Sequence, residues 1–280
     1  MIRFVEPRDL QEACAILAGD QWGNKLISGG TALVLMMRQG LIAPSTLVNI
    51  GHLEGMDGIA TDDTRITIGA KATHSDIATS PEVRRWLPAL ADACGRVGNV
   101  RVRNVGTLGG NLAEADYAAD PPTVLVGLDA VCHVTGSNGS RDLPVADLAT
   151  GFYSTSLSPG EIITGVSAPI GDDRVSAYEK YVSRSSEDRP CVGVFATARY
   201  DGSSLLQLSV VVGAAVAVPR RCDDITGSVA GSSLDDTTIR DMALAISEAI
   251  DPIEDARGTA WYRRKVTAVL VRRAVERVRR

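Results

Sequence analysis

The sequence predicts an α+β protein in two parts, a mixed N-terminal part followed by a smaller antiparallel sheet with helices. Three observations support this. The 280 residues are long for a single core. In the first 50 residues, strand-like and helix-like segments alternate around a glycine pair, which indicates a parallel βαβ-type unit. Beyond residues 171–173, three long apolar segments follow one another with few helices between them, which is typical of an antiparallel sheet.

The elements expected in the N-terminal part follow from apolar periodicity and from glycine and proline. In chain order they are a helix at 10–17, a strand at 25–28 that ends at Gly29-Gly30, a helix at 31–38, and strands at 46–50 and 65–69. A helical segment at 74–97, interrupted by Pro81 and Pro88, follows them. Residues 99–113 are rich in Gly and Asn and predict a loop, whereas Pro121 and Pro122 begin a helix that continues to about residue 130.

Strands at 131–135 and 162–168 complete the N-terminal part. The C-terminal part is expected to contain strands at 178–182, 192–200 and 205–218, then helices at 236–250 and 259–277. The last helix carries a basic series, for which either a solvated face or a docking surface for an acidic partner is open. Its members are Arg263, Arg264, Lys265, Arg272, Arg273, Arg277, Arg279 and Arg280.

Charge and cysteine spacing exclude several classes of protein. The formal net charge of −5 argues against a nucleic-acid binder. The longest apolar stretch, 208–218, is too short to span a bilayer, and no signal peptide is visible, so we expect a cytoplasmic protein. None of the five cysteines lies in a close pair, which favours free, buried thiols and no metal or cluster on this chain.

Two glycine-rich segments carry the strongest functional signal. The first, at 26–34, pairs Gly29 with Gly30 before Thr31, and the second, at 102–113, holds three glycines in five residues. Glycine lets the backbone turn sharply and approach a ligand, and neighbouring amides can then face a phosphate. Neither segment has the spacing of a Rossmann or P-loop motif, so two separate loops favour an extended dinucleotide. Asp120 then either accepts a hydrogen bond from a ribose hydroxyl or caps the following helix.

These segments resemble those of a known family. Segments 28–34 (SGGTALV), 103–113 (RNVGTLGGNLA) and 118–122 (AADPP) are similar to the FAD-binding (medium) subunit of the xanthine dehydrogenase / carbon monoxide dehydrogenase family of molybdenum hydroxylases. Later segments at 157–163, 178–184 and 262–274 match in the same order, so the resemblance covers nearly the whole chain. Ala32, Glu114 and Tyr117 depart from the family pattern near the flavin.

The resemblance implies a fold and a cofactor site. A two-subdomain, PCMH-type FAD-binding domain is expected at 1–173, with subdomains at about 1–55 and 56–173, and a C-terminal domain at 174–280. FAD is expected to lie extended between the subdomains, its pyrophosphate on loop 28–31 helped by Thr107, Gly110 and Asn111. Asp120 is placed on the adenosine or ribitol side, and Ile163 and Lys180 near the ring. The implied residues are Leu26, Ile27, Ser28, Gly29, Gly30, Thr31, Ala32, Val105, Thr107, Gly110, Asn111, Ala113, Asp120, Ile163 and Lys180.

The resemblance also implies chemistry and partners. A lysine near the flavin pyrimidine edge stabilises the anionic reduced ring, although Lys180 is equally compatible with a solvated strand residue. The expected partners are a large subunit with the molybdenum cofactor and a small subunit with [2Fe-2S] clusters, in a dimer of heterotrimers. Electrons pass from the clusters to FAD and on to an acceptor, and no catalytic residue is assigned to this chain. The alternatives are a self-sufficient FAD-dependent reductase or oxidase and a flavin-free scaffold.

Overall fold

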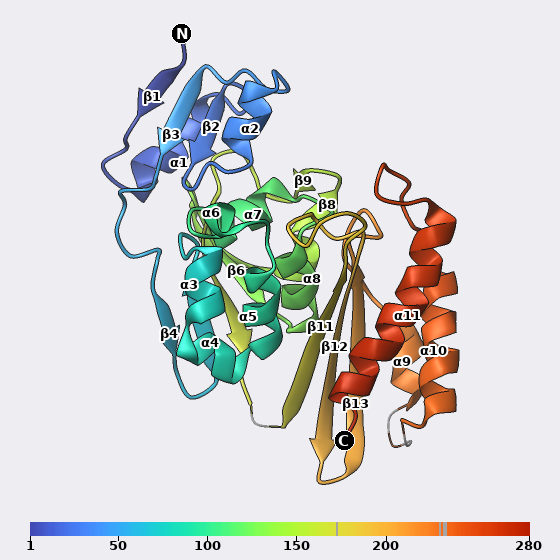
Figure 1. Cartoon of the computed structure of the whole chain (residues 1–280). Helices are drawn as coiled ribbons and strands as arrows, with labels where there is room; N and C mark the ends of the chain where they lie inside the picture. The colour runs from blue at the N-terminus through green and yellow to red at the C-terminus, as the bar shows by residue number, and fades with distance from the viewer. Residues whose placement is uncertain (172, 230, 232–233) are drawn as a thin grey trace.

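The computed structural model describes residues 1–171, 173–229, 231 and 234–280, and it is built around three sheets (Figure 1). The N-terminal sheet has the order β1-β3-β2, with all strands parallel. This confirms the predicted βαβ unit. Its elements are β1 (Arg3–Val5), α1 (Leu10–Gly19), β2 (Asn24–Ile27), α2 (Leu33–Arg38) and β3 (Thr46–Asn49).

The middle sheet is antiparallel and has the order β4-β5-β10-β6-β7. Pro81 and Pro88 each begin a new helix, as the sequence predicts, because proline is tolerated in the first turn and breaks the preceding helix. The strands are β4 (Ile59–Thr61), β5 (Arg65–Gly69), β6 (Val131–Gly136), β7 (Gly139–Pro144) and β10 (Ile162–Pro169), with a separate hairpin of β8 (Ala149–Gly151) and β9 (Ser154–Thr155). The helices beside them are α3 (His74–Thr79), α4 (Pro81–Trp86), α5 (Pro88–Gly95), α8 (Asp120–Gly127) and the 3-10 turn η1 (Val145–Asp147).

The prediction of a continuous loop at 99–113 is wrong, because two short helices lie there, α6 (Val100–Arg103) and α7 (Leu108–Glu114). Asn99 caps α6 by accepting from two backbone amides, and Thr107 caps α7 by accepting from the amide of Gly110. A side chain at Gly109 would press on Ala70, so only glycine allows α7 to lie this close to the middle layer. Caps and packing therefore override the low helix propensity of this segment.

The C-terminal sheet is antiparallel, as predicted, and its order is β11-β12-β13-β14, in which the short fourth strand was not predicted. Its third strand ends at residue 213 instead of continuing to 218, because Ala214 adopts a positive φ of 59° that breaks the extended backbone. The strands are β11 (Arg174–Tyr181), β12 (Val192–Asp201), β13 (Ser204–Gly213) and β14 (Arg220–Arg221). They are followed by α9 (Asp223–Thr226), η2 (Gly227–Val229), α10 (Asp236–Ala249) and α11 (Ala260–Val278).

Both faces of the C-terminal sheet are buried (Figure 1). Tyr178, Phe195 and Val211 point toward α8 and share its core, while the alternate residues pack under α10 and α11. The approach of α8 is very close, since an added Cβ would overlap the Thr123 hydroxyl at Gly213 and the Phe195 ring at Gly127. The absence of side chains at these two glycines therefore sets the distance between the middle and C-terminal layers.

We predict that Gly213→Ala lowers the free energy of unfolding by about 1–3 kcal/mol, because the methyl group overpacks the contact with Thr123. Urea denaturation measures this change. Gly227→Ala is the matched control, since no atom lies within 4 Å of a Cβ at that position, and its effect should stay within about 0.5 kcal/mol. Equal losses in the two variants would contradict the packing argument.

Candidate functional site

The structure brings the two glycine-rich loops together. Loop 28–31 follows β2, and loop 105–107 precedes α7. A Cβ on Gly29 would overlap the carbonyl oxygen of Val105, and a Cβ on Gly106 would lie 3.4 Å from the Thr31 hydroxyl oxygen. Glycine is therefore required where the two backbones meet, and the loops form one continuous surface, which we call the loop junction.

The two loops differ in the hydrogen bonds of their amides. The amides of residues 29–31 have no acceptor among the described residues, and Gly30 adopts a positive φ of 70°. The amides of Gly106, Leu108 and Gly109 donate instead to the carbonyl oxygens of Val102, Ala72 and Ala70. The expectation that the second loop presents several amides is thus wrong for these three. The first loop offers the donors, and the second forms a wall beside it.

The residues that the resemblance implies near the loop junction differ in their exposure to solvent. Asn111 on α7 has a side-chain oxygen that is shielded from solvent and has no hydrogen-bond partner in the described part of the chain. A buried acceptor without a partner is costly, and a bound ligand with a donor would satisfy it. Val105 is about half exposed and Ala113 is exposed, whereas Leu26, Ile27 and Ala32 are partly buried. The free amides and the unpaired oxygen of Asn111 fit a cofactor that carries both phosphates and hydroxyl groups.

His74 is a residue of the junction that the sequence did not single out. Its backbone amide donates to the carbonyl oxygen of Gly106, and its ring lies 3.2 Å from the position of a Cβ on that glycine. The side chain is only 2% exposed, and its Nδ1 has no partner among the described residues. Burial, with a smaller effect of the Arg103 charge, lowers the pKa of His74 to about 4. A neutral imidazole therefore supports the second loop from behind, and only the tertiary contact reveals it.

Asp120 and Lys180 form a buried ion pair. The Asp120 carboxylate accepts from Lys180 Nζ at 2.9 Å and from the Tyr178 hydroxyl at 2.8 Å, and Lys180 also donates to the Arg96 carbonyl oxygen. Both side chains of the pair are 4% exposed. Asp120 therefore is not a helix cap, since Ala119 occupies the cap position, and Lys180 is not a solvated strand residue. Ile163 is also buried, in the core of the middle layer.

Burial dominates the electrostatics of this pair. It raises the pKa of Asp120 from 3.8 to about 6, against the opposing attraction of the Lys180 charge. The same burial, together with the Asp120 charge, raises the pKa of the Tyr178 hydroxyl well above its usual value, which keeps that hydroxyl a donor. The three side chains therefore satisfy one another inside a region that excludes water.

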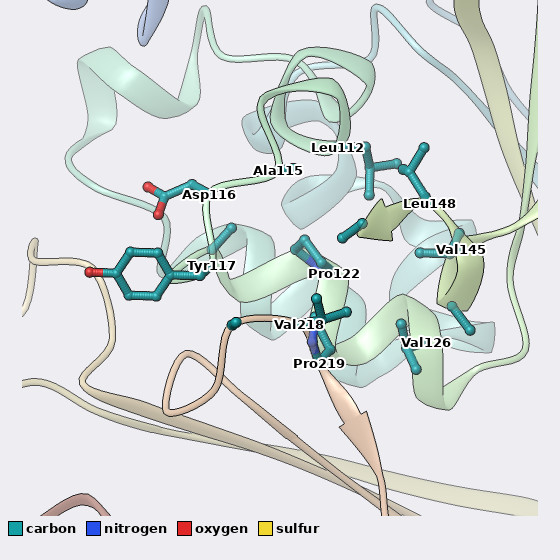
Figure 2. A pocket seen from close by; sticks show the side chains of 14 residues that line it. Leu112, Ala115, Asp116, Tyr117, Pro122, Val126, Val145, Leu148, Val218 and Pro219 are labelled. Atoms are coloured by element: carbon teal, nitrogen blue, oxygen red, sulfur yellow. The ribbon is translucent and has the colours of Figure 1, made fainter. Parts of the chain in front are cut away.

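An apolar pocket lies beside α7 and α8, and Figure 2 shows Asp116 and Tyr117 at one end of it. The Tyr117 hydroxyl donates to Asp255 at 2.6 Å, and its ring makes edge contacts with Phe152 and Tyr153. Tyr117 therefore ties the α7–α8 loop to the segment before α11. The lining contains none of the implied cofactor residues; it consists of Leu112, Ala115, Asp116, Tyr117, Ala119, Pro122, Val126, Val145, Ala146, Leu148, Ala149, Ala217, Val218 and Pro219.

The basic series of the last helix is interrupted by one buried member. Arg263 is fully buried, so its assignment to an exposed basic face is wrong. Its guanidinium donates to Asp255 at 2.5 Å, to the Ala214 carbonyl oxygen at 2.7 Å and to the Cys191 carbonyl oxygen.

The five cysteines are free and buried, as predicted. Within the described residues, no helix has the length and apolar character needed to cross a lipid bilayer.

Comparison with known proteins identifies the family. Residues 1–171 match the model of the FAD binding domain in molybdopterin dehydrogenase, and residues 176–278 match the CO dehydrogenase flavoprotein C-terminal domain. The chain belongs to the FAD-binding medium subunits of the molybdenum hydroxylase family. The resemblance inferred from the glycine loops is therefore confirmed, as are the α+β fold class and the assignment of FAD as cofactor.

Individual relatives match along nearly their whole length. The chain is 30% identical to the glyceraldehyde dehydrogenase medium chain of Sulfolobus acidocaldarius, over 98% of this chain and 97% of the relative. Its fold matches a chain of carbon monoxide dehydrogenase from Hydrogenophaga pseudoflava with a TM-score of 0.95 at 27% identity, covering 99% and 96% of the two chains. A chain of quinoline 2-oxidoreductase from Pseudomonas putida 86 matches with a TM-score of 0.93 at 26% identity, covering 99% and 97%. This protein is thus an FAD-binding subunit of a multi-subunit oxidoreductase.

We predict that Lys180→Met makes stability strongly dependent on pH. The pKa of Asp120 in the folded protein is already raised to about 6. The stability that this group contributes is therefore fully present at a pH below its pKa in the unfolded chain, and it is lost as the pH rises through its pKa in the folded protein. Without Lys180 that pKa rises further, so the free energy of unfolding should fall more steeply between about pH 5 and 8, by a few kcal/mol in all. Urea denaturation across this range measures the slope.

Two variants control for this experiment. Lys265→Met removes an exposed lysine of α11 and should keep the wild-type pH slope. Adding Asp120→Asn to Lys180→Met should abolish the extra slope, since the carboxyl group that causes it is then replaced by an amide that does not ionise. A Lys180→Met protein with the wild-type slope would show that Asp120 does not titrate in this way.

Proposed function

We propose that this chain accepts electrons from [2Fe-2S] clusters on a small partner subunit and passes them through FAD to an external acceptor. The observation that carries the proposal is the loop junction, where the amides of residues 29–31, which have no acceptor among the described residues, lie beside loop 105–107. Membership of the family supplies the context, since its members are flavin subunits of molybdenum hydroxylases. FAD supplies the chemistry, because it can take up electrons and release them to a second partner.

The roles of individual residues are part of this proposal. Residues 28–31 hold the pyrophosphate by backbone amides and the Thr31 hydroxyl, and Thr107, Gly110 and Asn111 bound it on the other side. The flanking residues Leu26, Ile27, Ala32, Val105 and Ala113 shape the same surface. Asp120, Ile163 and Lys180 act from beneath, since all three are buried, and they hold the layers that the cofactor contacts.

The proposed assembly contains a large subunit with the molybdenum cofactor and a small subunit with the [2Fe-2S] clusters, as a dimer of heterotrimers. Relatives named as medium chains or medium subunits support a complex of several chains. We also propose a division into an FAD-binding domain, 1–173, and a C-terminal domain, 174–280. In the described part of this chain, no group of three or more potential ligands could hold a metal ion. Within this proposal, substrate oxidation takes place on the large subunit, which carries the molybdenum cofactor.

Reconstitution separates the relay from a self-sufficient flavoenzyme. We predict that substrate of the complex bleaches the visible flavin band of this chain only when both partner chains are present. The measurement is a stopped-flow absorbance trace of the flavin-loaded chain alone, with each partner, and with both. Bleaching of the isolated chain by the substrate would instead favour a self-sufficient reductase or oxidase.

We predict that Gly29→Ala weakens FAD binding about tenfold or more, because the methyl group would push loop 28–31 away from Val105. Titration of the flavin-free chain with FAD, followed by flavin fluorescence, measures the dissociation constant. Gly58→Ala is the matched control, because a Cβ there meets no atom within 4 Å, and its affinity should equal that of the wild type. Circular dichroism of both variants checks that the fold is retained. Wild-type affinity in a folded Gly29→Ala protein would remove the loop junction from the FAD site.

A further inference from the structure

A second cavity lies between the middle and C-terminal layers, away from the loop junction. Its volume is about 170 Å³, and its polar lining comes from Arg85 on α4, Arg174 and Ser176 on β11, and Thr197 on β12. The ring of Trp86 closes one side. Figure 1 shows α4 and the lower end of the C-terminal sheet at the opposite end of the molecule from α2. No residue of the implied FAD site lines this cavity.

Strand register explains why these side chains meet. Arg174 and Ser176 are two residues apart on β11, so they point to the same face of the sheet, and Thr197 lies directly opposite Ser176 on β12. This is the face that carries Tyr178 and packs against the middle layer. Three polar side chains therefore project together into one part of the interface between the two layers.

Two donors in this cavity have no partner among the described residues. Thr197 is only 8% exposed, and its hydroxyl is shielded from solvent and makes no hydrogen bond. The Nη1 atom of Arg174 is likewise shielded and unpaired. Its Nη2 lies 3.9 Å from a carboxylate oxygen of Asp129, and that carboxylate is already engaged by Arg221 at 2.6 Å. Buried polar groups are nearly always satisfied, so this pair indicates a missing acceptor.

A second cation lies at the same place. The Arg85 guanidinium stacks over the Trp86 ring at 4.4 Å, which restrains it at the cavity wall. No carboxylate of the described residues forms an ion pair with Arg85. Among the described residues, two guanidinium groups and two hydroxyls line the cavity. The one carboxylate within 4 Å of the Arg174 guanidinium, that of Asp129, is shared with Arg221.

We propose that this cavity binds a small oxyanion of the phosphate class. Guanidinium groups and hydroxyls are the side chains that bind tetrahedral oxyanions by charge-assisted hydrogen bonds, and the unpaired Arg174 and Thr197 atoms are such donors. The volume fits a phosphate group with a few waters and is below the roughly 300 Å³ at which pockets for whole drug-sized ligands begin. The site joins β11 and β12 to α4, so a bound anion cross-links the two layers.

The test is calorimetric titration of the FAD-loaded chain with inorganic phosphate at constant ionic strength. We expect saturable binding, a flavin spectrum that does not change, and about tenfold weaker binding in Arg174→Gln. Arg273→Gln removes an exposed arginine of α11 and should bind phosphate as the wild type does. A phosphate monoester such as AMP, titrated in parallel, distinguishes a free ion from the phosphoryl group of a larger molecule, according to which binds more tightly.

Thr197→Val provides a variant that should fold. It removes the unpaired hydroxyl at nearly constant volume, so without phosphate its melting temperature should equal or exceed that of the wild type, while its affinity for phosphate falls. The proposal is overturned if phosphate does not bind saturably, or if acetate binds as tightly. It is also overturned if neither Arg174→Gln nor Thr197→Val changes the affinity.

Discussion

The buried ion pair between Asp120 and Lys180 is the interaction on which the arrangement of the layers depends. Asp120 stands at the start of α8, Lys180 belongs to β11, and the lysine also holds the carbonyl oxygen of Arg96 behind α5. One ammonium group therefore joins two helices to the C-terminal sheet. Burying both charges costs free energy, and the pair is tolerated because Tyr178 satisfies the second carboxylate oxygen. Removing one partner would leave a buried charge with no compensation, which makes this contact hard to replace singly.

The orientation of α8 in turn sets that of the second glycine loop. Only a short connection separates α8 from α7, and it begins at Ala115, which adopts a positive φ of 48°. Tyr117 in this connection is held by Asp255, which Arg263 also engages from within the C-terminal core. The loop junction is thus positioned from two sides. The first loop belongs to the small N-terminal core, whereas the second is fixed by hydrogen bonds to residues 70–74 of the middle layer.

Periodicity predicted most elements, because apolar spacing and proline positions are local signals. The parallel unit, the breaks at Pro81 and Pro88 and the antiparallel C-terminal sheet all followed from it. Helices α6 and α7 were not predicted, because their stability comes from caps and from packing at Gly109. The burial of Arg263 was not predicted either, for a related reason. Two of its acceptors, at residues 191 and 214, are far from it in sequence, and a turn separates it from the third, at residue 255. The pattern of charges along a helix does not reveal such acceptors.

Lys180 shows how the surroundings of a predicted site residue change the role expected of it. The family resemblance placed a lysine near the flavin as a source of positive charge. In the structure its ammonium lies 2.9 Å from Asp120, so the pair is close to neutral whenever that carboxyl group is ionised. A neutral pair exerts a much weaker field on a neighbouring group than a lone cation does. The pair fixes β11 and α8 relative to each other, and we therefore propose that Lys180 acts on a flavin site through geometry and not through its charge.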